Sequence, residues 1–358
     1  MAARRGKTYN AAFCQPPATG YAMLKISTRF HAGSVIVNDL SDPQNIRLAL
    51  RPDNAAAFAQ WFYFRLQGAA YQNCVMHFEN AASAAYPEGW QDYQARASYD
   101  RQNWFCVPTS YENGVLTINH TPLSNSVYYA YFEPYSGEQH LNLLGDAQGS
   151  GLCQISDLGS TPEGRDINLL TIGNQVESDL KIWITARQHP GETMAEWFVE
   201  GLLGRLLDPQ DPTARALLDQ ATFYIVPNMN PDGAALGNLR TNAAGANLNR
   251  EWLAPSVEKS PEVYYVREKM HETGVDLFLD IHGDETLPYV FVAGTEGVPN
   301  YSPNTAELER LFKTAFQAAS PDFQDQHGYE KDQPGQANLN MATAYVGNTF
   351  GCLAYTLE

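Results

Sequence analysis

The stretch ARQHPGETMAEW, residues 186–197, lies where a buried strand is followed by a helix. The preceding apolar run, LKIWIT at residues 180–185, is typical of a buried strand. After it, the apolar positions of residues 195–207 recur at helical spacing. His189 and Glu192 are therefore expected where a strand ends and a helix begins, the edge at which open α/β sheets place their sites.

A His and a Glu three residues apart at such a turn can bind one metal ion, but two protein ligands do not complete a zinc site. A third is expected where a second buried-strand pattern, LFLDI at residues 277–281, runs into His282. Each of the three residues also has a structural interpretation by itself. His189 could cap the helix, Glu192 could be an acid that interacts with the helix dipole in the first turn, and His282 could be a histidine at a strand end. Taken together, His189, Glu192 and His282 supply the three ligands of a catalytic zinc site with one zinc per chain.

The pattern around this stretch predicts an α/β domain. Strands are expected at residues 168–172, 181–185, 223–226, 277–281, 289–292 and 353–357, and helices at about 193–207, 211–219, 261–273 and 304–319. Such alternation favours a three-layer α/β/α domain with a mixed, mostly parallel sheet.

The first third of the chain has a different pattern. Residues 24–122 contain short aromatic or alternating runs, such as QWFYFRL at 60–66, separated by turn-forming clusters, as in an antiparallel β-sandwich. We predict an extension at residues 1–22, an N-terminal β-sandwich domain at 23–124 and a catalytic domain at 125–358.

Composition narrows the class of protein. A length of 358 residues favours two domains, and the net charge of −17 argues against nucleic acid as a partner. No run approaches 18 apolar residues, so no membrane span is expected, and the first residues lack the apolar core of a signal peptide. The five scattered cysteines favour a reducing cytoplasm without disulfides.

Three motifs together carry a family resemblance. HPGE at residues 189–192, ANLNREW at 246–252 and DIHGDE at 280–285 resemble the M14 zinc carboxypeptidases, the carboxypeptidase A-like metallopeptidases. Within that family they look like the cytosolic carboxypeptidase branch and its bacterial relatives, which carry an N-terminal β-sandwich. The resemblance implies a zinc-dependent hydrolase that releases single C-terminal amino acids from peptides or protein tails.

The resemblance also implies roles for residues around the zinc. Glu358, in YTLE at 355–358, matches the family's general base, and since the family continues into a further helix we expect the natural chain to do so. Arg240 matches the arginine that stabilises the oxyanion, and Asn249 and Arg250 match the pair that holds the substrate's terminal carboxylate. Without the resemblance, Glu358 would be interpreted as a surface glutamate, and Arg240 and Arg250 as ion-pair partners of acidic side chains.

One residue near the metal departs from the family pattern. Many members have Asp where this chain has Asn247, and that carboxylate orients a ligand histidine. An amide oxygen can accept the same imidazole proton without a charge. We therefore expect His189 to be a weaker ligand, with zinc still bound.

Specificity is less determined by the sequence. In the family the pocket floor comes from the segment before the base, here residues 335–351, and this segment lacks the arginine of members that trim glutamates. The preferred C-terminal residue, an acidic one included, therefore stays open. Lys331 or His327 would supply charge if its loop folds inward. Tyr345 and Tyr329 are the two candidates for the family's mobile tyrosine.

Two other functions stay open. The same fold and metal would serve an amidohydrolase acting on N-acyl amino acids or γ-glutamyl peptides. A catalytically silent module that binds C-termini is the second alternative, although a retained base at Glu358 argues against it. A peptide or protein C-terminus is the expected partner, and a homo-oligomer is compatible with the sequence.

Overall fold

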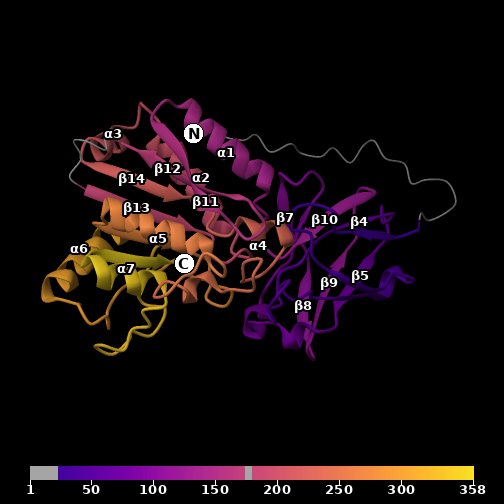
Figure 1. Ribbon diagram of the computed structural model, residues 1–358. Coiled ribbons are helices and arrows are strands. Elements are labelled where there is room, and N and C mark those ends of the chain that lie inside the picture. The colour runs from indigo at the N-terminus through magenta and orange to yellow at the C-terminus, as the bar shows by residue number, and fades with distance from the viewer. Residues whose placement is uncertain (1–22, 174–179) are drawn as a thin grey trace. The chain divides into compact units, whose positions relative to one another are not determined.

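The computed structural model describes residues 23–173 and 180–358, which form two units (Figure 1). Of these residues, the first unit contains 23–51 and 59–133, and the second contains 52–58 and 134–358. Residues 52–58 thus belong to the second unit although they lie within the first along the chain. The domain limits expected from the sequence remain a prediction. In the described parts of the chain, every helix is too short or too polar to cross a bilayer.

The first unit is a β-sandwich of two five-stranded sheets. One sheet has the order β1 (Lys25–Ser27), β4 (Tyr63–Gln67), β10 (Ser126–Ala130), β6 (Arg96–Ser98) and β7 (Trp104–Cys106). The other has the order β2 (Ile36–Asp39), β3 (Ile46–Ala49), β5 (Cys74–Phe78), β9 (Val115–His120) and β8 (Thr109–Glu112). Three short 3₁₀ helices connect these strands: η2 (Pro43–Asn45), η3 (Ala81–Ser83) and η4 (Pro87–Trp90).

The sandwich departs from the antiparallel expectation at one pairing. β3 and β5 run parallel, because the chain passes through β4 in the opposite sheet and then returns in its original direction. Between the sheets, Phe62 packs on Phe78 with ring centroids 4.6 Å apart. Burial of each such ring contributes about 1.5–3 kcal/mol to folding.

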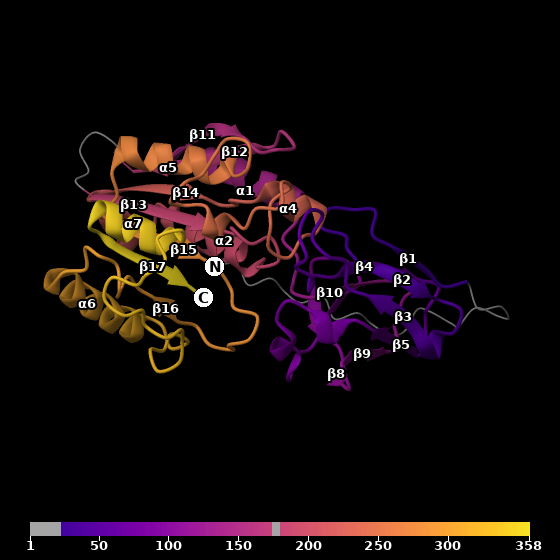
Figure 2. The same ribbon diagram turned by 60° about the horizontal axis from the view of Figure 1, so that its bottom comes forward.

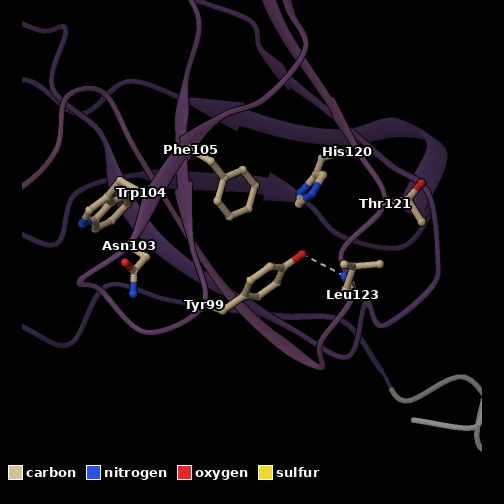
Figure 3. Close-up of a pocket in the computed structure, with 7 residues that line it drawn as sticks. All are labelled: Tyr99, Asn103, Trp104, Phe105, His120, Thr121 and Leu123. Atoms are coloured by element: carbon tan, nitrogen blue, oxygen red, sulfur yellow. Dashed lines mark hydrogen bonds between the residues drawn. The ribbon is translucent and has the colours of Figure 1, made fainter. Parts of the chain in front are cut away.

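The first unit also carries an aromatic pocket of about 510 Å³ (Figure 3). Two of its lining residues are connected, because the hydroxyl oxygen of Tyr99 accepts a hydrogen bond from the backbone N–H of Leu123 at 2.8 Å (Figure 3). The remaining lining residues are Asn103, Trp104, Phe105, His120 and Thr121. His120 is held by a contact between its Nδ1 and the hydroxyl of Tyr129, as suits a strand histidine.

The second unit contains a seven-stranded mixed sheet. Its order is β11 (Cys153–Ser160), β12 (Asp166–Ile172), β14 (Ala221–Val226), β13 (Leu180–Ala186), β15 (Leu277–Ile281), β17 (Leu353–Leu357) and β16 (Val292–Ala293). The four strands β14, β13, β15 and β17 are mutually parallel, because helical crossovers connect them, and the outer pairings are antiparallel. The carboxyl ends of β13, β15 and β17 therefore meet at one edge.

Helices cover both faces of this sheet, which gives the expected three layers (Figures 1 and 2). One face packs against α1 (Gly137–Gly149), α2 (Met194–Leu206) and α3 (Pro212–Leu218). The other packs against α5 (Pro261–Thr273) and α7 (Ala342–Phe350). Helix α6 (Pro303–Ala319) packs on β17, where Phe312 stacks on Tyr355 with centroids 4.7 Å apart. The short α4 (Pro231–Leu236) and η5 (Leu248–Arg250) follow β14.

Candidate active site

The turn after β13 is fixed by a buried arginine. Arg187 has a backbone φ of 60°, a left-handed conformation that costs free energy in a residue other than glycine. Its guanidinium donates hydrogen bonds to the carbonyls of Pro190 and Tyr135, each at 3.0 Å, and contacts the carboxylate of Glu196 on α2. These contacts hold the turn in the conformation that presents His189.

The three predicted metal ligands converge at this edge. β13 and β15 pair with Ala186 beside Ile281, so the residues that follow both strands lie close together. The Nδ1 of His189 lies 2.6 Å from Oε1 of Glu192, and the Nδ1 of His282 lies 2.7 Å from Oε2 of the same carboxylate. One ligand atom from each residue lies within 4.8 Å of the others, and all three residues are buried.

The outer nitrogens of both histidines contact oxygen atoms. The Nε2 of His189 lies 3.1 Å from Oδ1 of Asn247, and the Nε2 of His282 lies 2.8 Å from Oδ2 of Asp280. An oxygen partner favours a proton on Nε2, which leaves Nδ1 as the lone-pair donor facing Glu192. Two such nitrogens and a carboxylate are the ligand types that zinc prefers.

The surroundings shift the pKa values of the three residues in different directions. Burial lowers the pKa of His189 to about 4, so its ring is neutral near pH 7. Burial would raise the pKa of Glu192, but the two facing histidines outweigh it and hold the pKa well below its ordinary value. Burial also opposes a charge on His282, but the carboxylates of Asp280 and Glu192 raise its pKa well above the ordinary value.

The predicted base lies next to these ligands. β15 and β17 pair with Ile281 beside Leu357, and the backbone N–H of His282 donates to the carbonyl of Leu357 at 2.9 Å. Glu358 follows directly. Its Oε1 accepts a hydrogen bond from the hydroxyl of Tyr329 at 2.9 Å, whereas its Oε2 is buried without a hydrogen-bond partner. Burial raises the pKa of this carboxyl to about 8.

The structure separates the two candidate tyrosines. The Tyr329 hydroxyl oxygen lies 2.9 Å from Oε1 of Glu358 and 2.7 Å from Oδ2 of Asp284, within hydrogen-bond distance of each, so it lies at the site. Tyr345 instead belongs to α7 and packs on Trp252, with its hydroxyl 3.0 Å from the Nε2 of His271. Tyr329 is thus the tyrosine that contacts the predicted base.

Arg240 lies near the ligand cluster, where its charge helps to lower the pKa of His189. The guanidinium carbon of Arg240 lies 5.7 Å from the ring centroid of Phe58. Asn249 is 4% exposed, and its Oδ1 accepts the backbone N–H of Ala342 at 2.8 Å. Arg250 is exposed and donates to the carbonyl of Asn249 at 2.6 Å.

Three residues of this region were missed by the sequence reasoning. Asp280 lies on β15 two positions before His282, which follows the end of the strand, so continued period-two alternation places both side chains on one face. Gln188 donates to Asp280 at 2.5 Å and accepts from Trp252 at 2.9 Å. Glu285 is close enough to interact with Glu192, Arg240 and Glu358, and its pKa is well above the ordinary value because of burial. Only Asp280 had a signal in the strand pattern.

The two charged candidates for specificity have other contacts. The Nζ of Lys331 lies 2.7 Å from a carboxylate oxygen of Glu296, and its side chain is 70% exposed. His327 stacks on Tyr289 with ring centroids 4.3 Å apart. The segment expected to form the pocket floor, residues 335–351, contains α7, in which the hydroxyl of Thr343 lies 2.7 Å from that of Thr356 on β17.

Comparison with known proteins agrees with this geometry. Residues 141–358 match the zinc carboxypeptidase family, and residues 26–132 match the cytosolic carboxypeptidase N-terminal domain. The chain therefore belongs to the M14 zinc carboxypeptidases, as the motifs indicated, and it is a metallocarboxypeptidase of the cytosolic carboxypeptidase-like type.

Solved relatives share nearly the whole chain. A metallo-carboxypeptidase from Burkholderia cenocepacia is 54% identical with a TM-score of 0.92, over 94% of this chain and 90% of that one. A metallo-carboxypeptidase from Pseudomonas aeruginosa, solved in complex with (2-guanidinoethylmercapto)succinic acid, is 49% identical with a TM-score of 0.90, over 93% and 89%. Cytosolic carboxypeptidase 3 of Bos taurus is 27% identical over 76% of this chain, which spans 31% of that protein.

Proposed function

We propose that this chain releases single amino acids from the C-termini of peptides or protein tails, with one zinc held by His189, Glu192 and His282. The observation that carries the proposal is the convergence of two imidazole Nδ1 atoms and a carboxylate at one sheet edge, directly beside Glu358. A structural ion pair would need neither the second histidine nor the adjacent carboxylate with an unpartnered oxygen.

The residues around the metal have separate tasks. Zinc bound there supplies a Lewis acid that polarises a carbonyl and lowers the pKa of water. Glu358 takes the proton of the attacking water and returns it to the leaving amine. Its raised pKa suits both steps, because a general acid–base group works best near the ambient pH. Tyr329 orients that carboxylate through its hydroxyl.

The charge that develops on the substrate is met by Arg240. Its guanidinium stabilises the oxyanion as the carbonyl carbon becomes tetrahedral. Asn249 and Arg250 hold the free carboxylate of the last residue, which makes the enzyme an exopeptidase. The ligand of the P. aeruginosa relative supports carboxylate recognition, because succinic acid is a dicarboxylic acid.

The compartment that we propose is the cytoplasm. The cysteines Cys74, Cys106, Cys153 and Cys352 are free thiols, the state that a reducing compartment maintains.

Metal content and peptide release together test the proposed function. Mass spectrometry is expected to find one zinc per chain in the wild type and none in His282→Ala. The matched control is His271→Ala, which removes a histidine of α5 that contacts Tyr345 rather than the metal cluster. Peptides with free C-termini are expected to lose one residue at a time, whereas the same peptides with amidated C-termini are not.

Other outcomes identify the alternatives. Hydrolysis of N-acyl amino acids or γ-glutamyl peptides without release from ordinary peptides would replace the proposal with an amidohydrolase. Binding of free C-termini without turnover of any substrate would indicate a silent binding module. A zinc-free wild type purified without chelator would remove the metal mechanism.

A further inference from the structure

We infer that residues 52–58 are a positioning element for Arg240, in which Asp53 fixes the backbone of the arginine and Phe58 fixes its guanidinium. The segment lies far from Arg240 along the chain, and yet it packs as part of the same unit. The inference rests on the proposed role of Arg240 at the oxyanion, and it assigns the residues that hold the arginine there.

Asp53 binds three consecutive backbone N–H groups. Its Oδ1 accepts the N–H of Leu239 at 2.6 Å, and its Oδ2 accepts those of Arg240 at 3.0 Å and Thr241 at 2.8 Å. The hydroxyl of Thr241 donates to the same Oδ2 at 2.8 Å. These residues lie in an irregular loop between α4 and η5, and a loop without a hydrogen-bonding ladder must find other acceptors for its N–H groups. The carboxylate of Asp53, a buried residue with an exposed fraction of 6%, accepts all of these hydrogen bonds.

Asn54 contacts the same loop on either side of Arg240. Its backbone N–H donates to the side-chain oxygen of Asn238 at 3.1 Å, and the Asn238 amide donates back to Oδ1 of Asn54 at 2.7 Å. The side chain of Asn54 also donates to the carbonyl of Ala243 at 2.8 Å. The loop is thereby held before and after Arg240 as well as at it.

The backbone approach is close enough to require glycine. Gly245 has φ of +81°, and a Cβ at that position would lie 2.6 Å from the carbonyl oxygen of Ala55. The loop that carries Arg240 and the segment that holds it therefore fit together without space for a side chain at this point.

Phe58 contacts the guanidinium of Arg240, whereas Asp53 binds its backbone. The guanidinium carbon lies 5.7 Å from the ring centroid, a cation–π distance. An arginine side chain has many rotamers in water, and an oxyanion donor is effective only when it is already placed where the charge develops. Asp53 at the backbone and Phe58 at the guanidinium together restrict that freedom before substrate arrives.

Two pairs of variants test the element. Phe58→Leu removes the ring face, and Phe58→Tyr keeps it. We expect Phe58→Leu to lower kcat by about 10-fold or more with KM changed less than about twofold, because Arg240 acts mainly in the transition state. Phe58→Tyr is expected to retain most of kcat. Equal zinc content in all variants excludes an effect through the metal. An unchanged kcat in Phe58→Leu, or a loss that appears in KM alone, would overturn the inference.

Asp53→Asn tests the backbone clamp without reference to activity. Hydrogen exchange of zinc-free protein, followed on peptides that cover residues 238–242, is expected to be at least about 10-fold faster in this variant. The control is Asp211→Asn, since Asp211 accepts the backbone N–H groups of Thr213 and Ala214 at the start of α3, and it should leave that exchange unchanged. Unchanged exchange in Asp53→Asn would refute the clamp.

The two hypotheses fail in different ways. If wild-type protein releases no C-terminal residue, the proposed function fails, while hydrogen exchange still decides whether Asp53 holds the loop. If peptide release is normal in Phe58→Leu and exchange is normal in Asp53→Asn, the proposed function stands and the positioning element does not. Should Asp53→Asn fail to fold, the Phe58 pair decides the matter by itself.

Discussion

Asp280 holds the outer nitrogen of His282, with Oδ2 lying 2.8 Å from Nε2, while the inner nitrogen of the same ring faces Glu192. The carboxylate is itself fixed, because Thr185 and Gln188 donate to its two oxygens at 2.7 and 2.5 Å. A charged partner on one ring nitrogen increases the basicity of the other and orients the ring. The two proposed ligand histidines are therefore unequal, since His189 has only the amide oxygen of Asn247 in the same place.

Removal of the charge at Asp280 should weaken metal binding. In Asp280→Asn we expect zinc affinity to fall about 10- to 100-fold, as is typical for partners of ligand histidines. Competition with a chelator of known affinity measures the change. Asp276→Asn is the control, because Asp276 is exposed and lies directly before the same strand. Equal affinities for the two variants would show that Asp280 has no influence on the metal.

At Asn247 a substitution can add the charge that Asp280→Asn removes. Asn247→Asp places a carboxylate 3.1 Å from the Nε2 of His189 and should strengthen zinc binding by up to about 10-fold. Asn247→Ala removes the acceptor and should weaken it. The same chelator competition measures both variants, and a weaker site in Asn247→Asp would contradict this account of the inequality.

Much of this site could be predicted because its residues follow strands. His282 comes directly after the apolar strand Leu277–Ile281, and His189 lies three residues after the apolar strand Leu180–Ala186. The helix predicted at about 261–273 is α5. The residues that follow parallel strands meet at one edge of a sheet, so the strand pattern predicts that these ligands lie at the same edge. The pairing of β13 with β15 then places them side by side.

What escaped prediction depends on contacts between distant residues. Helix α7 has the sequence ATAYVGNTF, with β-branched residues and a glycine, and its first N–H is capped by the side chain of Asn249. Asp53 resembles any acid in a turn until the loop of Arg240 is placed against it. The local propensity of a sequence for helix or strand does not predict such contacts, since they depend on tertiary packing.

Glu358→Gln separates binding from chemistry. The amide keeps the size of the side chain but cannot take a proton, so turnover should fall about 100- to 10,000-fold while zinc content stays at one per chain. Steady-state kinetics and metal analysis measure the two quantities, and Tyr329→Phe, which removes the hydrogen bond to this carboxylate, should cause a smaller loss. Near-normal turnover in Glu358→Gln would remove it from the mechanism.

Glu262 makes the stability of the fold depend on pH. This residue of α5 is fully buried, and burial raises the pKa of its carboxyl to about 7 despite hydrogen bonds from Asn242. Because the folded state then binds the proton more tightly than the unfolded state, its contribution is present at pH 4.5 and is lost as the pH rises through 7.

The measurement compares wild type with Glu262→Gln, which does not titrate. Between pH 5 and 8 the free energy of unfolding of the wild type should decline relative to the variant by up to about 3 kcal/mol. Denaturant titrations at several pH values give the difference. A difference that is constant over this range would mean that Glu262 keeps an ordinary pKa.

Glu196 connects the stability of the fold to the placement of His189. Its buried carboxylate contacts Arg187 and accepts the amide of Asn228 at 3.0 Å, and Oε1 lies 2.8 Å from the Nδ1 of His140. Glu196→Gln leaves the buried Arg187 without its ionic partner, and such losses cost about 3–5 kcal/mol. Urea denaturation should show this destabilisation, whereas Glu200→Gln, one turn later and hydrogen-bonded to Tyr135, should cost much less.

Because Arg187 also holds the turn that presents His189, we expect Glu196→Gln to lose zinc affinity while still folded. A variant that is destabilised but keeps wild-type zinc affinity would show that the turn holds its shape without this ion pair.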